Sequence, residues 1–173
     1  ISACLVGSEM CIETGAGEAN TGGIRVINEG QTVRGNYLEG LTGSGFTGAL
    51  AVMNGVPNSV INRYHQVRGA LISRNSFIEP AAFILGAGAS EERSAAPVDV
   101  VVSDNLVASG RTAPPFQLLV DLGGFVFRNN VTDQPAPESL GFRAQPFTMT
   151  RARNGLLYPV ERALEAVLSL IHI

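Results

Sequence analysis

The sequence has 173 residues, of which 45% are apolar and 16% are charged, and its net charge is -3. A chain of this length can bury a sizeable core as one domain, and its slightly negative charge argues against a broad basic surface for nucleic acid. The absence of tryptophan, the 20 glycines and the many Val and Ile residues favour short strands joined by tight turns over a helical bundle. We therefore expect an all-β domain that does not bind nucleic acid.

The N-terminal segment ISACLVGSEM lacks the basic and apolar regions of a signal peptide. The chain starts without methionine, within a strand-like stretch, so we expect the native N-terminus to lie upstream. No apolar run reaches the roughly 20 residues that a membrane helix needs, and we expect no membrane contact. Cys4 and Cys11, the only cysteines, are either two buried thiols or a disulfide, and two cysteines alone cannot form a four-ligand metal site.

A short pattern recurs along the chain: an apolar residue, two spacers, an asparagine, one spacer and another apolar residue. It reads VRGNYL, ISRNSF, VSDNLV and VFRNNV, with the asparagines at Asn36, Asn75, Asn105 and Asn129. The flanking residues are β-prone, and glycine, proline or charged loops separate the units. Such recurrence is typical of stacked repeats.

An asparagine at a tight bend tolerates the left-handed backbone region and bonds to the backbone of a neighbouring coil. Stacked coils place one asparagine above another, so that their side-chain amides form a ladder. We predict a right-handed parallel β-helix, a β-solenoid with projecting loops, in which these asparagines belong to the scaffold. A ligand-binding role for them is the alternative.

Two segments exceed a minimal coil, and loops that project from a solenoid can shape a groove. The longer excursion covers residues 42–67 and contains Arg63, Tyr64 and His65. The second, GAGASEERSAAP, is small and charged, and it is interpreted as a surface loop.

The C-terminal segment LSLIHI, residues 168–173, follows abruptly on the helix-like VERALEAV. The transposon-end adapter of sequencing libraries can encode these six residues. We therefore assign residues 1–167 to a partial β-helix domain and residues 168–173 to a non-native read-through tail.

The segments GGIRV, NYLEGL, MNGVPNS and NRYHQV resemble, in order and spacing, polysaccharide lyase family six, which comprises alginate lyases and chondroitinase B-type enzymes. The likeness covers about residues 20 to 80 closely and the rest loosely, and NGLLYP looks like the end of the family's helical domain. It implies a parallel β-helix that cleaves uronic-acid-containing polysaccharide by β-elimination. A cation must neutralise the uronate carboxylate, a base must remove the neighbouring proton, and an acid must protonate the leaving oxygen.

In this family a calcium ion is the usual neutraliser, with a lysine as base and an arginine as acid. The chain has no lysine, because all 12 of its basic residues are arginines. The resemblance places the lysine, the arginine of the LRHG motif and the calcium ligands upstream of Ile1. We therefore predict a fragment of the catalytic domain with no catalytic residue and no metal ligand of its own, inactive by itself, whose full-length parent binds calcium.

Three residues are predicted to bind the acidic polysaccharide. Arg25 matches the arginine of the GGIRV segment, and its planar guanidinium suits a carboxylate; the alternative is a solvated residue at a strand edge. Arg63 either does likewise or clamps its own loop, and Tyr64 either stacks on a sugar ring or caps the coil as a buried aromatic. Glu29 lacks the further acids of a metal site nearby, and His65 is expected to be structural.

A different class of function stays open, namely a non-catalytic carbohydrate-binding β-solenoid or an adhesin-like scaffold, which the missing lysine fits equally well. A pectinase-type hydrolase would need a cluster of aspartates in one coil, and no such cluster is seen in the sequence around Asp99, Asp104 and Asp121. Secretion or export to the periplasm is inferred from the resemblance and from the size of the substrate. The choice between alginate and a dermatan or chondroitin substrate, the endo or exo mode of action, the uronate epimer and the oligomeric state are left open by the sequence.

Overall fold

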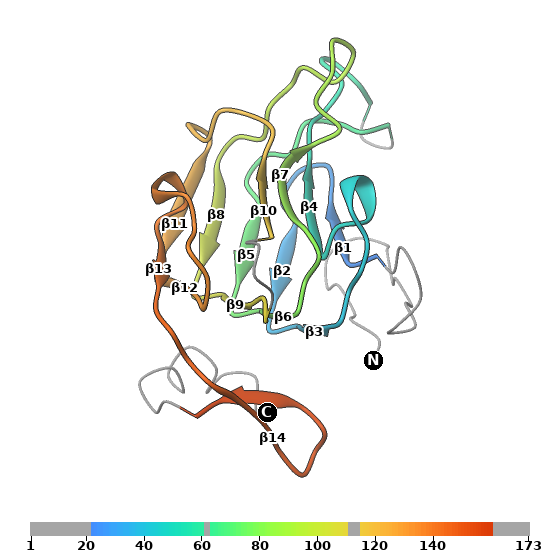
Figure 1. Ribbon diagram of the computed structural model, residues 1–173. Coiled ribbons are helices and arrows are strands. Elements are labelled where there is room, and N and C mark those ends of the chain that lie inside the picture. Colours follow the sequence, from blue (N-terminus) through green and yellow to red (C-terminus); the bar gives the residue numbers. More distant parts are fainter. Residues whose placement is uncertain (1–21, 61–62, 111–114, 161–173) are drawn as a thin grey trace.

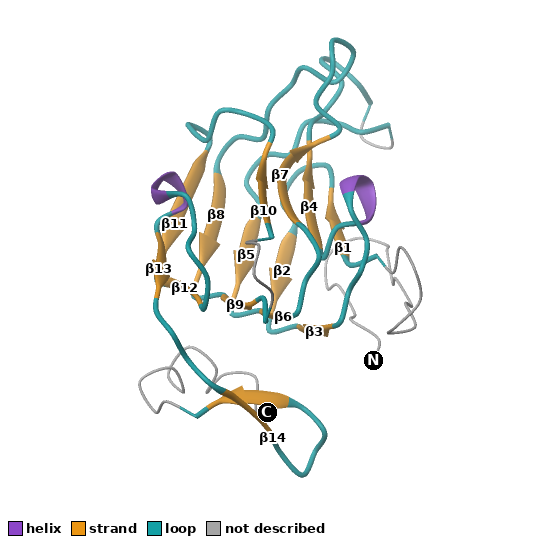
Figure 2. Ribbon diagram, viewed as in Figure 1, coloured by secondary structure: helices purple, strands orange, loops and turns teal. Residues whose placement is uncertain are grey.

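The computed structural model describes residues 22–60, 63–110 and 115–160. The predictions for Cys4 and Cys11, for most of VERALEAV and for the tail at 168–173 lie outside these ranges. The described residues form short strands and two 3-10 helices, η1 (Gly45–Thr47) and η2 (Glu138–Leu140) (Figure 2). No helix in these ranges is long and apolar enough to cross a membrane.

The strands form three parallel sheets, which the chain visits in turn (Figure 1). The first sheet has the order β1-β4-β7-β10, with β1 (Ile24–Val26), β4 (Leu50–Met53), β7 (Phe83–Ala87) and β10 (Phe116–Leu118). The second has the order β11-β8-β5-β2, with β2 (Thr32–Arg34), β5 (Leu71–Ser73), β8 (Val100–Ser103) and β11 (Phe125–Arg128). The third has the order β13-β12-β9-β6-β3, with β3 (Tyr37–Glu39), β6 (Ser76–Ile78), β9 (Leu106–Ala108), β12 (Asn130–Thr132) and β13 (Phe142–Ala144).

One coil consists of consecutive strands in the first, second and third sheets, and each strand pairs in parallel with the matching strand of the next coil. This is the predicted parallel β-helix, which is thereby confirmed. The last coil departs from the rule, because β12 and β13 are consecutive in the chain and lie side by side in the third sheet.

The core lies between the three sheets and is centred on Phe83 of β7, whose side chain is fully buried. Its ring packs edge-to-face against the rings of three other phenylalanines. The distances between ring centroids are 5.4 Å to Phe77, 5.6 Å to Phe116 and 6.0 Å to Phe142. These rings come from strands of different coils and sheets. Aromatic contacts therefore join the coils across the interior.

A ladder of asparagine side chains runs along the corner between the second and third sheets. Its members are Asn36, Asn75, Asn105 and Asn130. At each step the Oδ1 atom of one asparagine accepts the backbone N–H, at 3.0 Å, and the Nδ2–H, at 2.9 Å, of the asparagine in the preceding coil. Three of the amides also donate to backbone carbonyls, those of Val33, Ile72 and Val102. The predicted scaffold role of the repeated asparagines is thus confirmed for the first three units.

The fourth unit was assigned to the wrong asparagine. Asn129 is exposed, and its Nδ2 donates to Asp104 Oδ1 at 3.2 Å, whereas Asn130 is fully buried in the ladder. The error arose because Asn129 is flanked by valines at the expected positions, Val126 and Val131, although Val126 is 42% exposed.

The backbone role of the ladder asparagines was also predicted wrongly. Positive φ belongs to the residue just before each one, which is Gly35 (68°), Arg74 (57°), Asp104 (57°) or Asn129 (53°). The bend is therefore made by one residue, and the next residue supplies the amide. This division explains why the bend tolerates varied side chains, whereas the ladder position holds asparagine each time.

The predicted excursion at residues 42–67 is only partly a loop, because it contains η1 and the core strand β4. Both faces of β4 and β7 are buried. Their outer face carries a second apolar cluster, made of Ala51, Met53, Ala82, Ile84 and Ala87. This sheet therefore has a covered outer face, and the segments that cover it form the candidate site.

A hairpin follows the last coil and consists of β14 (Met149–Arg151) and β15 (Leu157–Pro159), paired antiparallel. Its apolar side chains pack on the outer face of the third sheet. Arg151 Nη2 bonds to Glu39 Oε1 at 2.5 Å, and Tyr37 Oη accepts the Leu157 N–H at 3.0 Å. The hairpin therefore contacts the first described coil, far away in the sequence.

Candidate functional site

Two long loops project from the same corner of consecutive coils, where the chain passes from the first sheet to the second (Figure 1). Loop 54–70 follows β4, and loop 88–99 follows β7. Gly55 and Ala95 exchange backbone N–H···O bonds of 2.8 and 3.0 Å, and Asn54 Nδ2 donates to a carbonyl of loop 88–99 at 2.9 Å. The two loops therefore support each other as one unit.

The two loops contribute Tyr64 and Arg93 to a cluster of two arginines and two aromatic rings, which Arg25 and Phe46 complete and which we call the arginine–aromatic cluster. The guanidinium carbon of Arg93 is 4.6 Å from the centroid of the Tyr64 ring and 5.2 Å from that of Phe46. Arg25 lies over the Phe46 ring at 5.8 Å. Attraction between cations and ring faces holds the two positive charges close to each other.

Arg25 reaches the cluster from β1, and neighbouring segments fix its orientation. Its Nε donates to the Phe46 carbonyl at 3.0 Å, and its Nη1 donates to Tyr64 Oη at 3.5 Å. Neither Arg25 nor Arg93 forms an ion pair with a carboxylate among the described residues. The Nε of Arg93 is buried and has no hydrogen-bond partner in the described part of the chain. Such an arrangement can accept an anionic ligand.

Of the three residues predicted to bind substrate, the structure brings Arg25 and Tyr64 together. Tyr64 is half-buried, and its ring also packs on the apolar outer face of the first sheet. Arg63 has no contact with this cluster among the described residues, and its hydrogen bonds there are made by its backbone. Its N–H donates to Val60, and its carbonyl accepts the Ser59 hydroxyl. The binding role of all three stays a prediction.

Sequence reasoning missed Arg93 and Phe46. Arg93 lies in the charged run SEERS, which reads as an ordinary surface loop, and Phe46 lies in a glycine-rich stretch. Their partners are far along the chain, and only the stacking of coils brings them together. No motif in a single sequence carries that information.

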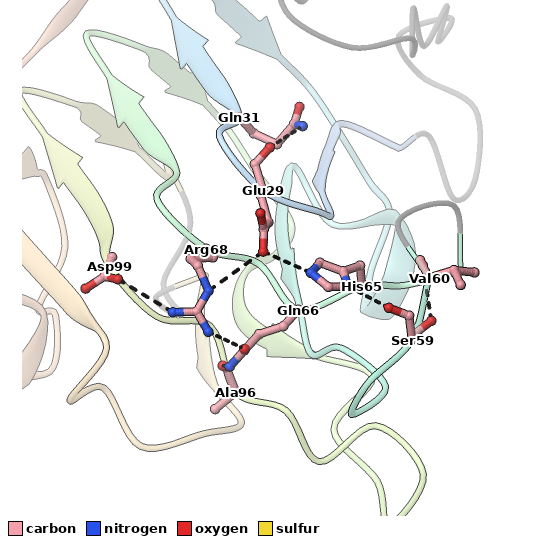
Figure 3. Close-up of polar contacts among 9 residues, drawn as sticks. All are labelled: Glu29, Gln31, Ser59, Val60, His65, Gln66, Arg68, Ala96 and Asp99. Atoms are coloured by element: carbon pink, nitrogen blue, oxygen red, sulfur yellow. Dashed lines mark hydrogen bonds and ion pairs between the residues drawn. The ribbon is translucent and has the colours of Figure 1, made fainter.

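A polar network joins side chains of three coils (Figure 3), and its member His65 directly follows Tyr64 of the cluster in the chain. Glu29 Oε1 lies 2.9 Å from His65 Nε2 and 3.8 Å from Arg68 Nε, and Arg68 Nη1 lies 4.0 Å from Asp99 Oδ2. The same corner is stacked through its backbone, since Glu29 and Arg68 form a parallel bridge. His65 thus has the structural contacts expected of it. The described residues contain no group of three His, Cys, Asp or Glu side chains able to hold a metal ion.

The model of the Chondroitinase B family matches residues 3–167. The solved structure of AlyGC, an alginate lyase of polysaccharide lyase family six, is 44% identical, with a TM-score of 0.80; the likeness covers 84% of this chain and 20% of that one. A mannuronic acid specific lyase of the same family, from human gut microbiota, is 26% identical, with a TM-score of 0.58, over 73% of this chain and 31% of its own. No curated protein matches the chain.

A further alginate lyase of that family, in complex with a trisaccharide, is 18% identical over 83% of this chain and 36% of its own, with a TM-score of 0.56. At that identity the likeness concerns the fold alone. The chain spans about a fifth of the length of AlyGC.

Proposed function

Because the chain belongs to the Chondroitinase B family of polysaccharide lyases, we propose that it forms the substrate-holding part of an enzyme that cleaves a uronic-acid-containing polysaccharide by β-elimination. The observation that supports this proposal is the arginine–aromatic cluster, in which two guanidiniums without acidic partners among the described residues lie beside two rings. A uronate polymer offers one carboxylate per sugar, together with apolar sugar faces.

Alginate is the proposed substrate, ahead of a dermatan or chondroitin polymer. Two similar structures support this choice of substrate. AlyGC, which is 44% identical, is an alginate lyase, and the lyase from human gut microbiota is specific for mannuronic acid. A polymer of that size is met outside the cytoplasm. We therefore also propose that the complete protein is secreted or periplasmic.

The reaction removes the C5 proton of the uronate, forms a double bond between C4 and C5, and breaks the bond from C4 to the glycosidic oxygen, which takes up a proton. The C5 proton is poorly acidic beside a charged carboxylate, so positive charge at that carboxylate lowers the barrier. Arg25 and Arg93 would hold the carboxylate of a bound sugar. The half-buried Tyr64 and the exposed ring of Phe46 would contact sugar faces.

The proton-transferring residues are proposed to lie upstream of Ile1. The chain has no lysine to act as base, since all 12 of its basic residues are arginines. Calcium is likewise proposed to bind upstream, because the described residues offer no matching set of acidic ligands. The chain by itself is therefore expected to bind the polymer without cleaving it.

The proposal is tested with the product of the complete gene and with the 173-residue chain, each mixed with alginate or dermatan sulfate, with calcium or with a chelator. The unsaturated product is followed by its ultraviolet absorbance. We expect alginate to yield product with the complete enzyme only, and chelation to stop the reaction. No product from either polymer would favour the carbohydrate-binding scaffold instead.

Arg25→Gln in the complete enzyme is expected to lower kcat/KM by about tenfold to a hundredfold, the usual effect of losing one charge-assisted hydrogen bond. The matched control is Arg34→Gln, because Arg34 is an exposed arginine on β2, in the same coil. Equal effects of the two changes would mean that Arg25 contributes only general positive charge.

A further inference from the structure

Both ring nitrogens of His65 face oxygen atoms that accept hydrogen bonds (Figure 3). Nδ1 lies 2.7 Å from the carbonyl oxygen of Ser59, and Nε2 lies 2.9 Å from Glu29 Oε1. A carbonyl and a carboxylate cannot donate, so both bonds need a proton on both nitrogens. Only the positively charged imidazolium satisfies this arrangement, and the neutral ring must give up one bond.

The two bonds join parts of the molecule that come from different coils. Ser59 lies in loop 54–70, where its hydroxyl also donates to the Arg63 carbonyl at 2.5 Å, whereas Glu29 lies in the bend between β1 and β2. His65 therefore fastens loop 54–70 to the preceding coil. The His65 side chain is 25% exposed and that of Glu29 is 52% exposed, so the bridge lies at the surface, where solvent protons reach the ring.

Tyr64 is the chain neighbour of His65 and belongs to the arginine–aromatic cluster. It precedes His65 and adopts a left-handed conformation with φ of 54°, which is unfavourable for a bulky side chain. Its carbonyl accepts the Val56 N–H at 2.9 Å, and its ring and hydroxyl meet Arg93 and Arg25. A strained residue of this kind persists where its surroundings hold it on several sides.

We propose that His65 is a positioning residue, whose protonated ring bridges Ser59 and Glu29 and thereby holds Tyr64 in the arginine–aromatic cluster, so that affinity for an acidic oligosaccharide falls when the ring loses its proton. This inference rests on the proposed function, because it concerns the same binding surface. It adds a pH-sensitive support for that surface.

The direction of the pH effect follows from the charges around the ring. The Ser59 carbonyl and then the Glu29 carboxylate raise the pKa of His65 above its ordinary value of 6.5, and the positive charge of Arg68 acts against them. Within the described residues, Glu29 and Arg68 are the charged groups that face the ring, and Asp99 lies beyond Arg68. A raised pKa means that the bridge is complete below about pH 6.5 and is lost as the pH rises through the folded value.

The first test needs no ligand. The histidines of the 173-residue chain are followed by NMR from about pH 5.5 to about pH 8.5, and His172→Gln identifies the His65 signals. We expect a His65 midpoint above 6.5 and Tyr64 signals that shift with the same midpoint. Glu29→Gln should lower both midpoints together. Tyr64 signals that ignore the His65 titration would overturn the positioning role.

The second test measures the affinity of the chain for an alginate tetrasaccharide over the same pH range by calorimetry. The Kd should rise about fivefold or more on the alkaline side, a coupling of ordinary size between two sites. In His65→Gln the affinity should be weak and independent of pH. Asp99→Asn is the matched control, because it removes a carboxylate from the same network without touching His65, and it should keep the wild-type profile.

The outcomes separate this inference from the proposed function. Binding with one pH profile in the wild type and in His65→Gln would keep the function and overturn the inference. If no variant binds the tetrasaccharide, both the proposed function and the predicted change in affinity are wrong. The NMR titration would then still decide whether the bridge positions the tyrosine, because Tyr64 and His65 must share one midpoint if it does.

Discussion

At the scale of single residues, the asparagine ladder buries polar amide groups and gives each of them hydrogen-bond partners, which offsets the free-energy cost of removing them from water. Asn105 is fully buried, and its Nδ2 donates both to Asn130 Oδ1 and to the Ile72 carbonyl, at 2.9 Å each. Its Oδ1 accepts two N–H groups of Asn75. Since each group satisfies the next, removal of one amide leaves several unpaired polar atoms in the interior.

Asn105→Ala is therefore expected to lower the free energy of unfolding by about 3 kcal/mol, because buried donors and acceptors lose their partners. Asn129→Gly is the control: it removes an exposed amide and relieves a positive φ of 53°, so its effect should stay within about 0.5 kcal/mol. Urea denaturation of the variants measures both. Equal losses would contradict the assignment of Asn130, rather than Asn129, to the ladder.

At the scale of elements, the C-terminal hairpin depends on a small group of polar contacts. Arg151, on β14, hydrogen-bonds to Glu39 and holds the pKa of that carboxyl below its ordinary value of 4.5. The Tyr37 hydroxyl, which donates to Glu39 at 2.7 Å, acts in the same direction. Burial raises the pKa of Tyr37 to about 12, so its hydroxyl keeps its proton and goes on donating. The hairpin is thus tied to an ionised Glu39.

A lowered carboxyl pKa contributes stability above the unfolded value and loses it as the pH falls through the folded value. The stabilisation of the wild type relative to Arg151→Gln should therefore be complete above about pH 4.5 and shrink at lower pH. Hydrogen exchange of the Leu157 N–H, which bonds to Tyr37, reports on the hairpin itself. A difference between the two proteins that is constant over this range would exclude the Glu39 contact as its source.

The sequence was sufficient for the elements whose signal is local. Short β-prone units around Asn36, Asn75 and Asn105 predicted the coils and the ladder, and the fourth unit failed because valines beside Asn129 imitate the pattern. The candidate site is different in kind. Arg25 contacts Tyr64 only because the coils stack, and Arg93 contacts Tyr64 only because the two loops pair. Neither contact can therefore be predicted from a local sequence pattern.

At the scale of the whole molecule, the coils act on one another through a shared aromatic interior. Phe83 touches the rings of three other phenylalanines, which belong to β6, β10 and β13. In a solenoid each coil is stabilised chiefly by its neighbours. A side chain that spans several coils therefore affects the stability of all of them.

Phe83→Ala is expected to lower the free energy of unfolding by about 3–5 kcal/mol, the range for removing a buried aromatic ring. Val126→Ala, at a side chain that is 42% exposed, should change it by about 0.5 kcal/mol or less. Calorimetry should show one transition that moves to lower temperature as a whole. Separate melting of the N-terminal and C-terminal coils would mean that Phe83 does not link them.

The two loops that support each other lie at one corner of the solenoid, and the amide ladder lies at another. The amides that specify the stacking of the coils are therefore separate from the residues that are proposed to bind a ligand. Lengthening a flexible loop costs little, since the entropy of closing it grows only logarithmically with its length. Because loops 54–70 and 88–99 pair with each other, an engineer who exchanges them should exchange both together, and if the proposed binding role holds, such an exchange would alter sugar preference while the amide ladder stays intact.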